Sequence, residues 1–193
     1  MRRSLVLALA LGFAMLTPRV LPAQETPTFA DLAWGSSRDS AKSALVAKGY
    51  TFVEEDSDHD LQFRTTVLQQ LTAVYLMFNP HGELVKVYVV LATPDAAARG
   101  VYKQMVDVLS DKYGDPTMRV ENFEAPYQKG DGSEDEAIKA GKATLATIWT
   151  PKAKVGYGIS CRVTVNLAVG VSYEPSTWHE EFERRSRNST RDF

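Results

Sequence analysis

Residues 72–91 read TAVYLMFNPHGELVKVYVVL and predict two strands joined by a tight turn. Apolar side chains alternate along both strands and occupy both of their faces. Between the strands, Asn79-Pro80-His81-Gly82 has proline at the second position and glycine at the fourth, which suits a type I turn. We therefore expect an antiparallel hairpin, Thr72 to Phe78 with Leu84 to Leu91, in the middle of a sheet.

Six further segments are predicted as strands on either side of this hairpin. They are Thr51 to Glu55, Leu61 to Thr65, Met118 to Asn122, Thr144 to Thr150, Gly158 to Val165, and Val169 to Tyr173. An acidic turn, 56–60, separates the first two.

Three helices are predicted from their caps and from apolar residues at three- and four-residue steps. The first begins at Ser36 or Ser37, where Ser36 and Asp39 fit a capping box, and ends at Gly49. The second, which has the clearest periodicity, runs from Pro94 to Gly114. A short terminal helix covers 177–184.

Together these elements predict an α+β fold with two layers, in which the helices pack on one face of a curved antiparallel sheet. A helix followed by four strands occurs twice, so the domain at 24–175 divides into two such units, 24–93 and 94–175. The polar stretch at about 125–143 is expected to be a mobile insertion with about one helical turn, and 176–193 forms the terminal helix and tail.

The first 23 residues predict a signal peptide. Arg2 and Arg3 precede an apolar run that is too short to span a bilayer, and Ala23 provides a small residue for cleavage. Cleavage there leaves 170 residues with a net charge of about −5. We expect a periplasmic or secreted protein of bacterial type, with no transmembrane anchor and no nucleic-acid partner, since nucleic-acid binders usually carry a basic patch.

Cys161 is the only cysteine, so no internal disulfide is expected. It falls on the apolar side of an alternating segment, which indicates a buried, inert thiol. No cysteine lies at the predicted cleavage site, so no lipid anchor is expected.

Catalytic motifs are absent from the sequence. Gly35-Ser36-Ser37-Arg38-Asp39 lacks the final glycine of a nucleophile elbow, and no Ser-x-x-Lys or His-Glu-x-x-His occurs. His59, His81 and His179 are interpreted as surface residues. We therefore expect no enzyme activity, no cofactor and no metal site, with a hydrolase whose catalytic site carries no motif as the least favoured alternative.

Two charged segments have a competing interpretation. Asp56, Asp58 and Asp60 alternate as in a calcium loop, but Leu61 and Val67 replace its glycine and its last acid, which favours a solvated turn. Arginines 184, 185, 187 and 191 could contact an anionic surface, but neighbouring glutamates favour a solvated tail.

The predicted hairpin is the best candidate for a binding surface. Helices on one side of the sheet would leave Tyr75, Met77 and Tyr88 exposed on the other side, and such residues are common at interfaces. Trp149 is proposed as a further anchor. The alternative is that the insertion, the terminal helix or the curvature of the sheet covers this face.

Trp34-Gly35-Ser36-Ser37 opens the first predicted helix and Lys48-Gly49-Tyr50 ends it, ahead of a run of strands. This pattern resembles a group of small secreted bacterial proteins that includes the β-lactamase inhibitor proteins and the small lipoprotein of the outer-membrane β-barrel assembly machinery. The resemblance implies a helix layer against a curved antiparallel sheet, and a role in binding other proteins. The chain lacks the lipidated cysteine of the assembly lipoprotein.

The sequence thus predicts a non-enzymatic protein that binds an envelope or extracellular protein through an apolar sheet face. A homodimer through the same face is an alternative, as is a carrier of a small apolar ligand.

Overall fold

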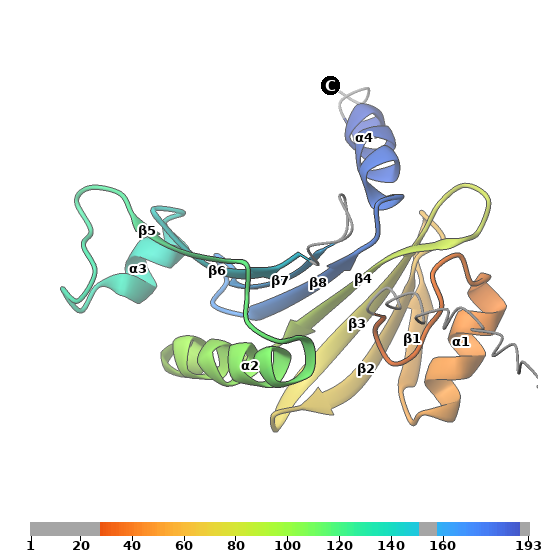
Figure 1. Cartoon of the computed structure of the whole chain (residues 1–193), viewed down its shortest axis with the longest axis horizontal. Coiled ribbons are helices and arrows are strands. Elements are labelled where there is room, and N and C mark those ends of the chain that lie inside the picture. Colours follow the sequence, from red (N-terminus) through yellow and green to blue (C-terminus); the bar gives the residue numbers. More distant parts are fainter. Residues whose placement is uncertain (1–27, 151–157, 190–193) are drawn as a thin grey trace, which may run out of the picture.

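The computed structural model describes residues 28–150 and 158–189. The predicted signal peptide and Arg191 lie outside these residues. The described residues form an α+β fold, with eight strands in one antiparallel sheet and four α-helices (Figure 1).

All eight predicted strands are confirmed, and each end lies within two residues of its prediction. The strands are β1 (Thr51–Glu55), β2 (Leu61–Val67), β3 (Gln70–Phe78), β4 (Leu84–Leu91), β5 (Met118–Phe123), β6 (Ala143–Trp149), β7 (Gly158–Val163) and β8 (Val169–Glu174). Their order in the sheet is β1-β2-β3-β4-β8-β7-β6-β5. The two halves of the sheet therefore meet where β4 pairs with β8.

The helices are α1 (Arg38–Ala47), α2 (Ala98–Tyr113), α3 (Glu134–Lys139) and α4 (Trp178–Ser189), and a short 3₁₀ turn (Asp95–Ala97) leads into α2. The N-cap of α1 is Ser37, whose hydroxyl accepts the Ser40 N–H; Ser36 instead donates to the Ala33 carbonyl. The capping box predicted at Ser36 is therefore wrong by one residue. At the other end, Gly49 has φ +85° and Tyr50 N–H bonds the Leu45 carbonyl, which closes the helix as a Schellman motif.

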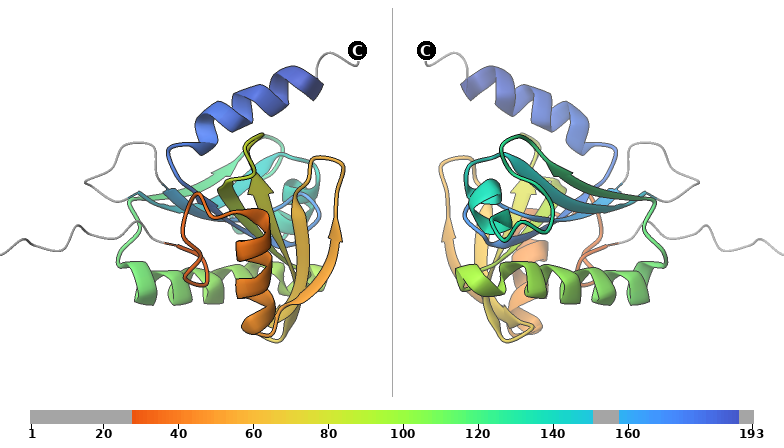
Figure 2. Two further views of the ribbon diagram at one scale, coloured as in Figure 1. Left: turned by 90° about the vertical axis from the view of Figure 1, so that its right-hand side faces the viewer. Right: turned by 90° about the vertical axis from the view of Figure 1, so that its left-hand side faces the viewer.

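One apolar core lies between the sheet and the helices α1 and α2. It combines Ala41 and Leu45 of α1 with Met105 and Leu109 of α2 and with one side of most of the strands. In the strands, the side chains that alternate with these core residues point to the opposite side. Helix α4 lies over that opposite side of the sheet (Figures 1 and 2), so the prediction that the helices pack on a single face is not confirmed.

The acidic stretch expected to be a mobile insertion contains α3, which packs Ala137 and Ile138 inward. Ile138 is buried with Ala98, Val163 and Leu167 in a second apolar cluster. Ion pairs join this segment to its surroundings, including Arg99 with Asp135 and Lys139 with Asp95. Whether the two helix-plus-four-strand halves are separate units remains a prediction.

None of the helices in the described part of the chain is both long and apolar enough to cross a membrane.

Cys161 is buried, as predicted, and burial raises the pKa of its thiol to about 12. We expect a disulfide reagent such as 5,5′-dithiobis(2-nitrobenzoate) to label the native protein at pH 8 only as fast as the protein unfolds, because the thiolate is the reacting form.

The unfolded thiol ionises near pH 9, below the folded one, so this residue lowers the free energy of unfolding as pH rises from about 9 to 12. A Cys161→Ala variant should show a flatter decline in urea titrations over that range. Rapid labelling of the native protein would contradict the buried placement.

Candidate functional site

The sheet surface opposite α1 and α2, here called the free face, carries three of the four predicted binding residues. Tyr75 and Met77 lie on it from β3 and Tyr88 lies on it from β4, all half-buried. Tyr75 pairs directly with Tyr88 across the strands, and their rings stack with centroids 6.5 Å apart. The structure thus brings these three residues together, as expected from the alternation in residues 72–91.

Trp149 is not part of this surface. It lies on the opposite side of the sheet, where only 4% of it is exposed, and its indole N–H donates to the Gly114 carbonyl at 2.9 Å. The sequence identified a strand here but did not identify which side of it would face the core.

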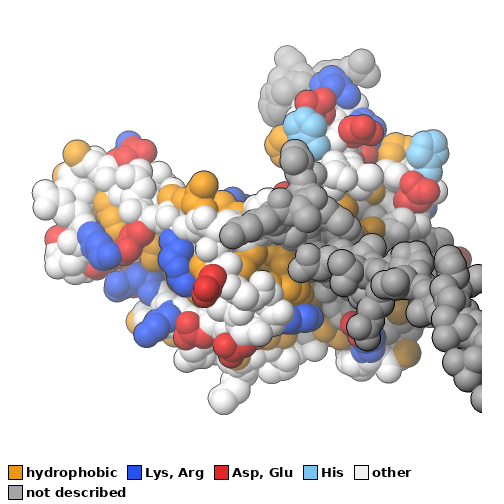
Figure 3. Space-filling view, in the orientation of Figure 1, with side chains coloured by type: hydrophobic (Ala, Val, Ile, Leu, Met, Phe, Trp, Pro, Cys, Tyr) orange, Lys and Arg blue, Asp and Glu red, His pale blue; other side chains and the backbone are white. Residues whose placement is uncertain are grey.

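On the free face, side chains of residues that pair across neighbouring strands form rows that cross the sheet. The central row contains Tyr75, Tyr88, Ser172, Ser160, Ile148 and Met118, in that order. Large side chains occupy both ends of this row, and two serines occupy its middle. The surface therefore has a depression along β8 and β7 between an aromatic side and an aliphatic side. Apolar side chains reach the surface over β5 and β6 in Figure 3. Met118 of β5 is 55% exposed.

Glycine and serine on alternate residues of two paired strands create this depression. Gly158 and Ser160 face it from β7, while Gly170 and Ser172 face it from β8. The space above Gly170 is taken by Tyr88: a Cβ at that position would lie 2.5 Å from the Tyr88 hydroxyl oxygen. The signal was present in the segments GISCR and GVSYE, but the search for large apolar anchors overlooked small residues.

Helix α4 forms a second wall and converts the depression into a groove. The groove has a volume of about 720 Å³. Trp178, His179 and Phe182 of α4 line one side of it, and Met77, Lys86 and Tyr88 line the adjacent sheet surface. We call this space the α4 groove. Charged side chains of both signs cover the outside of α4 in Figure 3.

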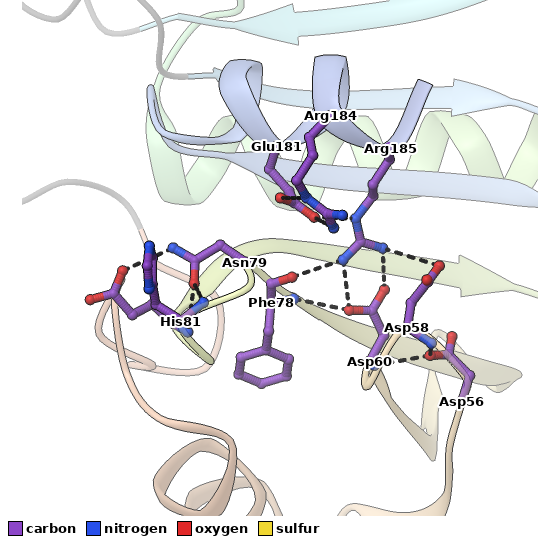
Figure 4. Close-up of polar contacts among 10 residues, drawn as sticks. Asp56, Asp58, Asp60, Phe78, Asn79, His81, Glu181, Arg184 and Arg185 are labelled. Carbon is purple, nitrogen blue, oxygen red and sulfur yellow. Dashed lines mark hydrogen bonds and ion pairs between the residues drawn. The ribbon is translucent and has the colours of Figure 1, made fainter. Parts of the chain in front are cut away.

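An ion pair between the half-buried Arg185 and the buried Asp60 holds α4 in this position (Figure 4). Arg185 donates to both carboxylate oxygens of Asp60, at 2.6 and 2.9 Å, and to the Phe78 carbonyl at 2.9 Å. Asp60 also accepts the Phe78 backbone N–H at 3.0 Å and is 5% exposed. The hydrogen bonds that Arg185 donates to Asp60 raise the pKa of the Arg185 guanidinium, which stays charged.

Glu181 completes the anchor from within α4. Its carboxylate accepts hydrogen bonds from Arg184 and from Arg185. Burial alone would raise the pKa of this carboxyl, but the two arginines outweigh burial and lower the pKa. The interpretation of Arg184 and Arg185 as part of a solvated tail is therefore wrong.

The acidic turn at 56–60 supports the same anchor. Asp56 accepts the backbone N–H groups of Asp58 and Asp60, which fixes the turn, and Asp60 points inward to Arg185. The interpretation of this whole segment as solvated is wrong for Asp60. Among the described residues, no group of three or more His, Cys, Asp or Glu side chains is arranged to hold a metal ion.

Charges inside the α4 groove are paired at one end and unpaired at the other. Near α4, Lys86 Nζ lies 2.6 Å from Glu174 and 4.3 Å from the centroid of the Trp178 ring, and Ser172 donates to the same Glu174 oxygen. Arg162 lies at the other end, two residues along β7 from Ser160 and on the side away from α4. It is exposed, and its side chain makes no hydrogen bond or ion pair with any described residue.

The predicted surface histidines are exposed. His59 contacts Glu55 at 2.7 Å and His179 contacts Glu183 at 3.2 Å, and the two residues of each pair are four positions apart in the sequence. His81 lies in the β3–β4 turn, where Gly82 N–H bonds the Asn79 carbonyl as in a type I turn. The described residues of the α4 groove offer aromatic and apolar contact, hydroxyl hydrogen bonds, and the guanidinium of Arg162, which no described residue binds.

The contact between Tyr88 and Gly170 can be tested by a double-mutant cycle. We expect Gly170→Ala to lower the free energy of unfolding by about 1–3 kcal/mol, because the added methyl displaces the Tyr88 ring. In a Tyr88→Ala background the same change should cost close to nothing. As a control, Gly100→Ala in α2 meets no atom within 4 Å and should stabilise by about 0.5–1 kcal/mol. Equal costs of Gly170→Ala in both backgrounds, measured in urea, would contradict the contact.

The anchor of α4 yields a second prediction. Asp60→Asn removes one of the two carboxylates that bind Arg185, the other being Glu181, and should lower the free energy of unfolding by about 2 kcal/mol. Asp58→Asn is the matched control: Asp58 is exposed, lies 4.0 Å from Arg185, and should cost less than about 1 kcal/mol. Limited proteolysis should cut within α4 faster in the Asp60 variant alone. Similar behaviour of the two variants would refute the assignment of the anchor to Asp60.

No protein-family model, curated protein or solved structure matches this chain. The candidate site is therefore described by its own residues: a groove between a helix and the free face of an antiparallel sheet, with aromatic walls, a floor of small residues and an arginine that no described residue binds.

Proposed function

We propose that this is a non-enzymatic periplasmic or secreted protein that holds a segment of another protein in the α4 groove. One observation supports this most directly. The chain covers the free face with α4 alone among its described helices, and leaves a groove of about 720 Å³ lined by half-buried Tyr88, Met77 and Trp178.

The construction of the groove suits an extended polypeptide. Its floor consists of paired central strands, which form a rigid surface, and it runs along them past α4. Tyrosine, tryptophan and methionine are enriched at the centres of protein interfaces. Phe182, 54% exposed on α4, adds an apolar contact that a partner would cover.

The remaining features of the proposal come from the sequence. The predicted signal peptide supports location in the periplasm or medium. The resemblance to the β-lactamase inhibitor proteins and the assembly lipoprotein supports a binding role. If 24–93 and 94–175 are two units, the groove lies across their junction, since β4 and β8 pair there.

A second candidate is a carrier of a small, partly apolar ligand. The volume of the groove favours it, because ligand sites usually measure about 300–1,000 Å³. A carrier should bind in the absence of any protein partner.

Site-specific photo-crosslinking in the native host separates the two candidates. Benzoylphenylalanine replaces Phe182, which lines the groove, or Val46 of α1, which is 50% exposed on the helix side of the sheet. We expect a protein adduct of discrete mass from position 182 alone. Ser160→Trp should abolish the adduct by filling the floor, whereas Ser160→Ala should preserve it.

The mass of the adduct identifies the partner. Twice the monomer mass would identify a second copy of the chain. If position 182 gives no adduct that depends on Ser160, the protein-binding proposal fails and the carrier becomes the better description.

A further inference from the structure

The α4 groove carries one charge that the described chain does not neutralise. Among the described lining residues Glu174 is the only carboxylate, and Lys86 neutralises it at 2.6 Å. His179, at the edge, pairs with Glu183. Arg162 alone projects into the groove without a hydrogen bond or ion pair to any described residue, and it is exposed. The described lining of the groove is thus neutral next to α4 and positive at its far end.

We infer that the segment held in the α4 groove is acidic, with one carboxylate that pairs with Arg162 and a bulky apolar side chain that packs beneath α4. This inference rests on the proposed function and specifies its partner. A guanidinium presents parallel N–H groups that match the two oxygens of a carboxylate. Trp178, Phe182 and Met77 provide the apolar contact at the other end.

The sheet register sets the spacing between these two groups. Arg162 pairs with Gly170, and Glu174 lies four residues further along the same strand, beside Lys86 and α4. Four residues of strand span about 13 Å. An extended segment that follows the groove therefore presents its acid and its apolar side chain about four residues apart.

A single carboxylate fits these charges better than a polyanion. The chain has a net charge of −2, or about −5 without its predicted signal peptide, so acidic side chains outnumber basic ones. These charges would repel a nucleic acid or a strongly anionic surface. One unpaired arginine offers a local site that favours a single acid, in agreement with the complementarity that gives interfaces their specificity.

Selection from a phage-displayed library of random twelve-residue peptides tests the inference. The immobilised protein is the target, and phage that also bind the groove-filling variant Ser160→Trp are discarded. We expect enrichment of peptides with Asp or Glu four residues from Phe, Trp, Leu, Ile or Met. Arg162→Gln should weaken the selected peptides by roughly tenfold or more, since hydrogen bonds between charged groups are the strong ones.

Charge reversal provides the sharpest comparison. Selection on Arg162→Glu should enrich Lys or Arg at the former acid position and keep the apolar position unchanged. Arg162 is exposed and unpaired among the described residues, so both substitutions should leave the urea unfolding midpoint unaltered.

The possible results distinguish this inference from the proposal beneath it. Peptides that require an open groove but show no acid, or that ignore Arg162→Glu, would overturn the acidic partner and leave protein binding intact. If no peptide distinguishes the protein from Ser160→Trp, both the inference and the binding of an extended segment are refuted.

Discussion

The ion pair between Arg185 and Asp60 determines whether this molecule has a groove at all. The two residues are 125 positions apart, and their contact fixes the terminal helix to the start of β2 and the end of β3. Burying an isolated arginine or aspartate is costly, so each requires the other once α4 is docked. Without that contact the free face would be an open sheet surface, and Trp178 and Phe182 would have no fixed position against it. The same pair thus contributes to stability and sets the shape of the site.

The second constraint is the alternation of small residues in β7 and β8. Gly158, Ser160, Gly170 and Ser172 share one face, while Ile159, Cys161, Val169 and Val171 on the other face belong to the core. On the helix side, these strands therefore contribute apolar side chains to the core. On the free face, their small side chains leave room for the groove. Tyr88 occupies part of that space by lying over Gly170, which fixes the aromatic wall of the groove.

Much of this fold could be predicted because its signals are local. Alternation in residues 72–91 predicted the central hairpin, and the spacing of apolar residues predicted α2. The shift of the cap from Ser36 to Ser37 is a one-residue error of the kind that local rules leave open. The roles of Trp149 and Asp60 could not be predicted, because each depends on a partner distant in sequence: Gly114 for the indole, and Arg185 for the carboxylate. The site followed the same division. That Tyr75, Met77 and Tyr88 share one face of the sheet could be predicted from their own strands. The groove, which Met77 and Tyr88 line, depends on the pairing of β4 with β8 and on the position of α4.

That pairing also dictates the order in which the molecule can be completed during synthesis. Strand β4 lies in the middle of the finished sheet, but its neighbour β8 is 78 residues away along the chain, from Leu91 to Val169. Until β8 has been made, the edge of β4 that will receive it exposes unpaired backbone groups in the apolar segment LVKVYVVL. Such an edge readily pairs with other chains. A nascent or truncated chain that ends before residue 169 therefore exposes the edge of β4, where it can pair with other chains. Strand β8, the last strand in the sequence, covers this edge and so protects the centre of the sheet from aggregation.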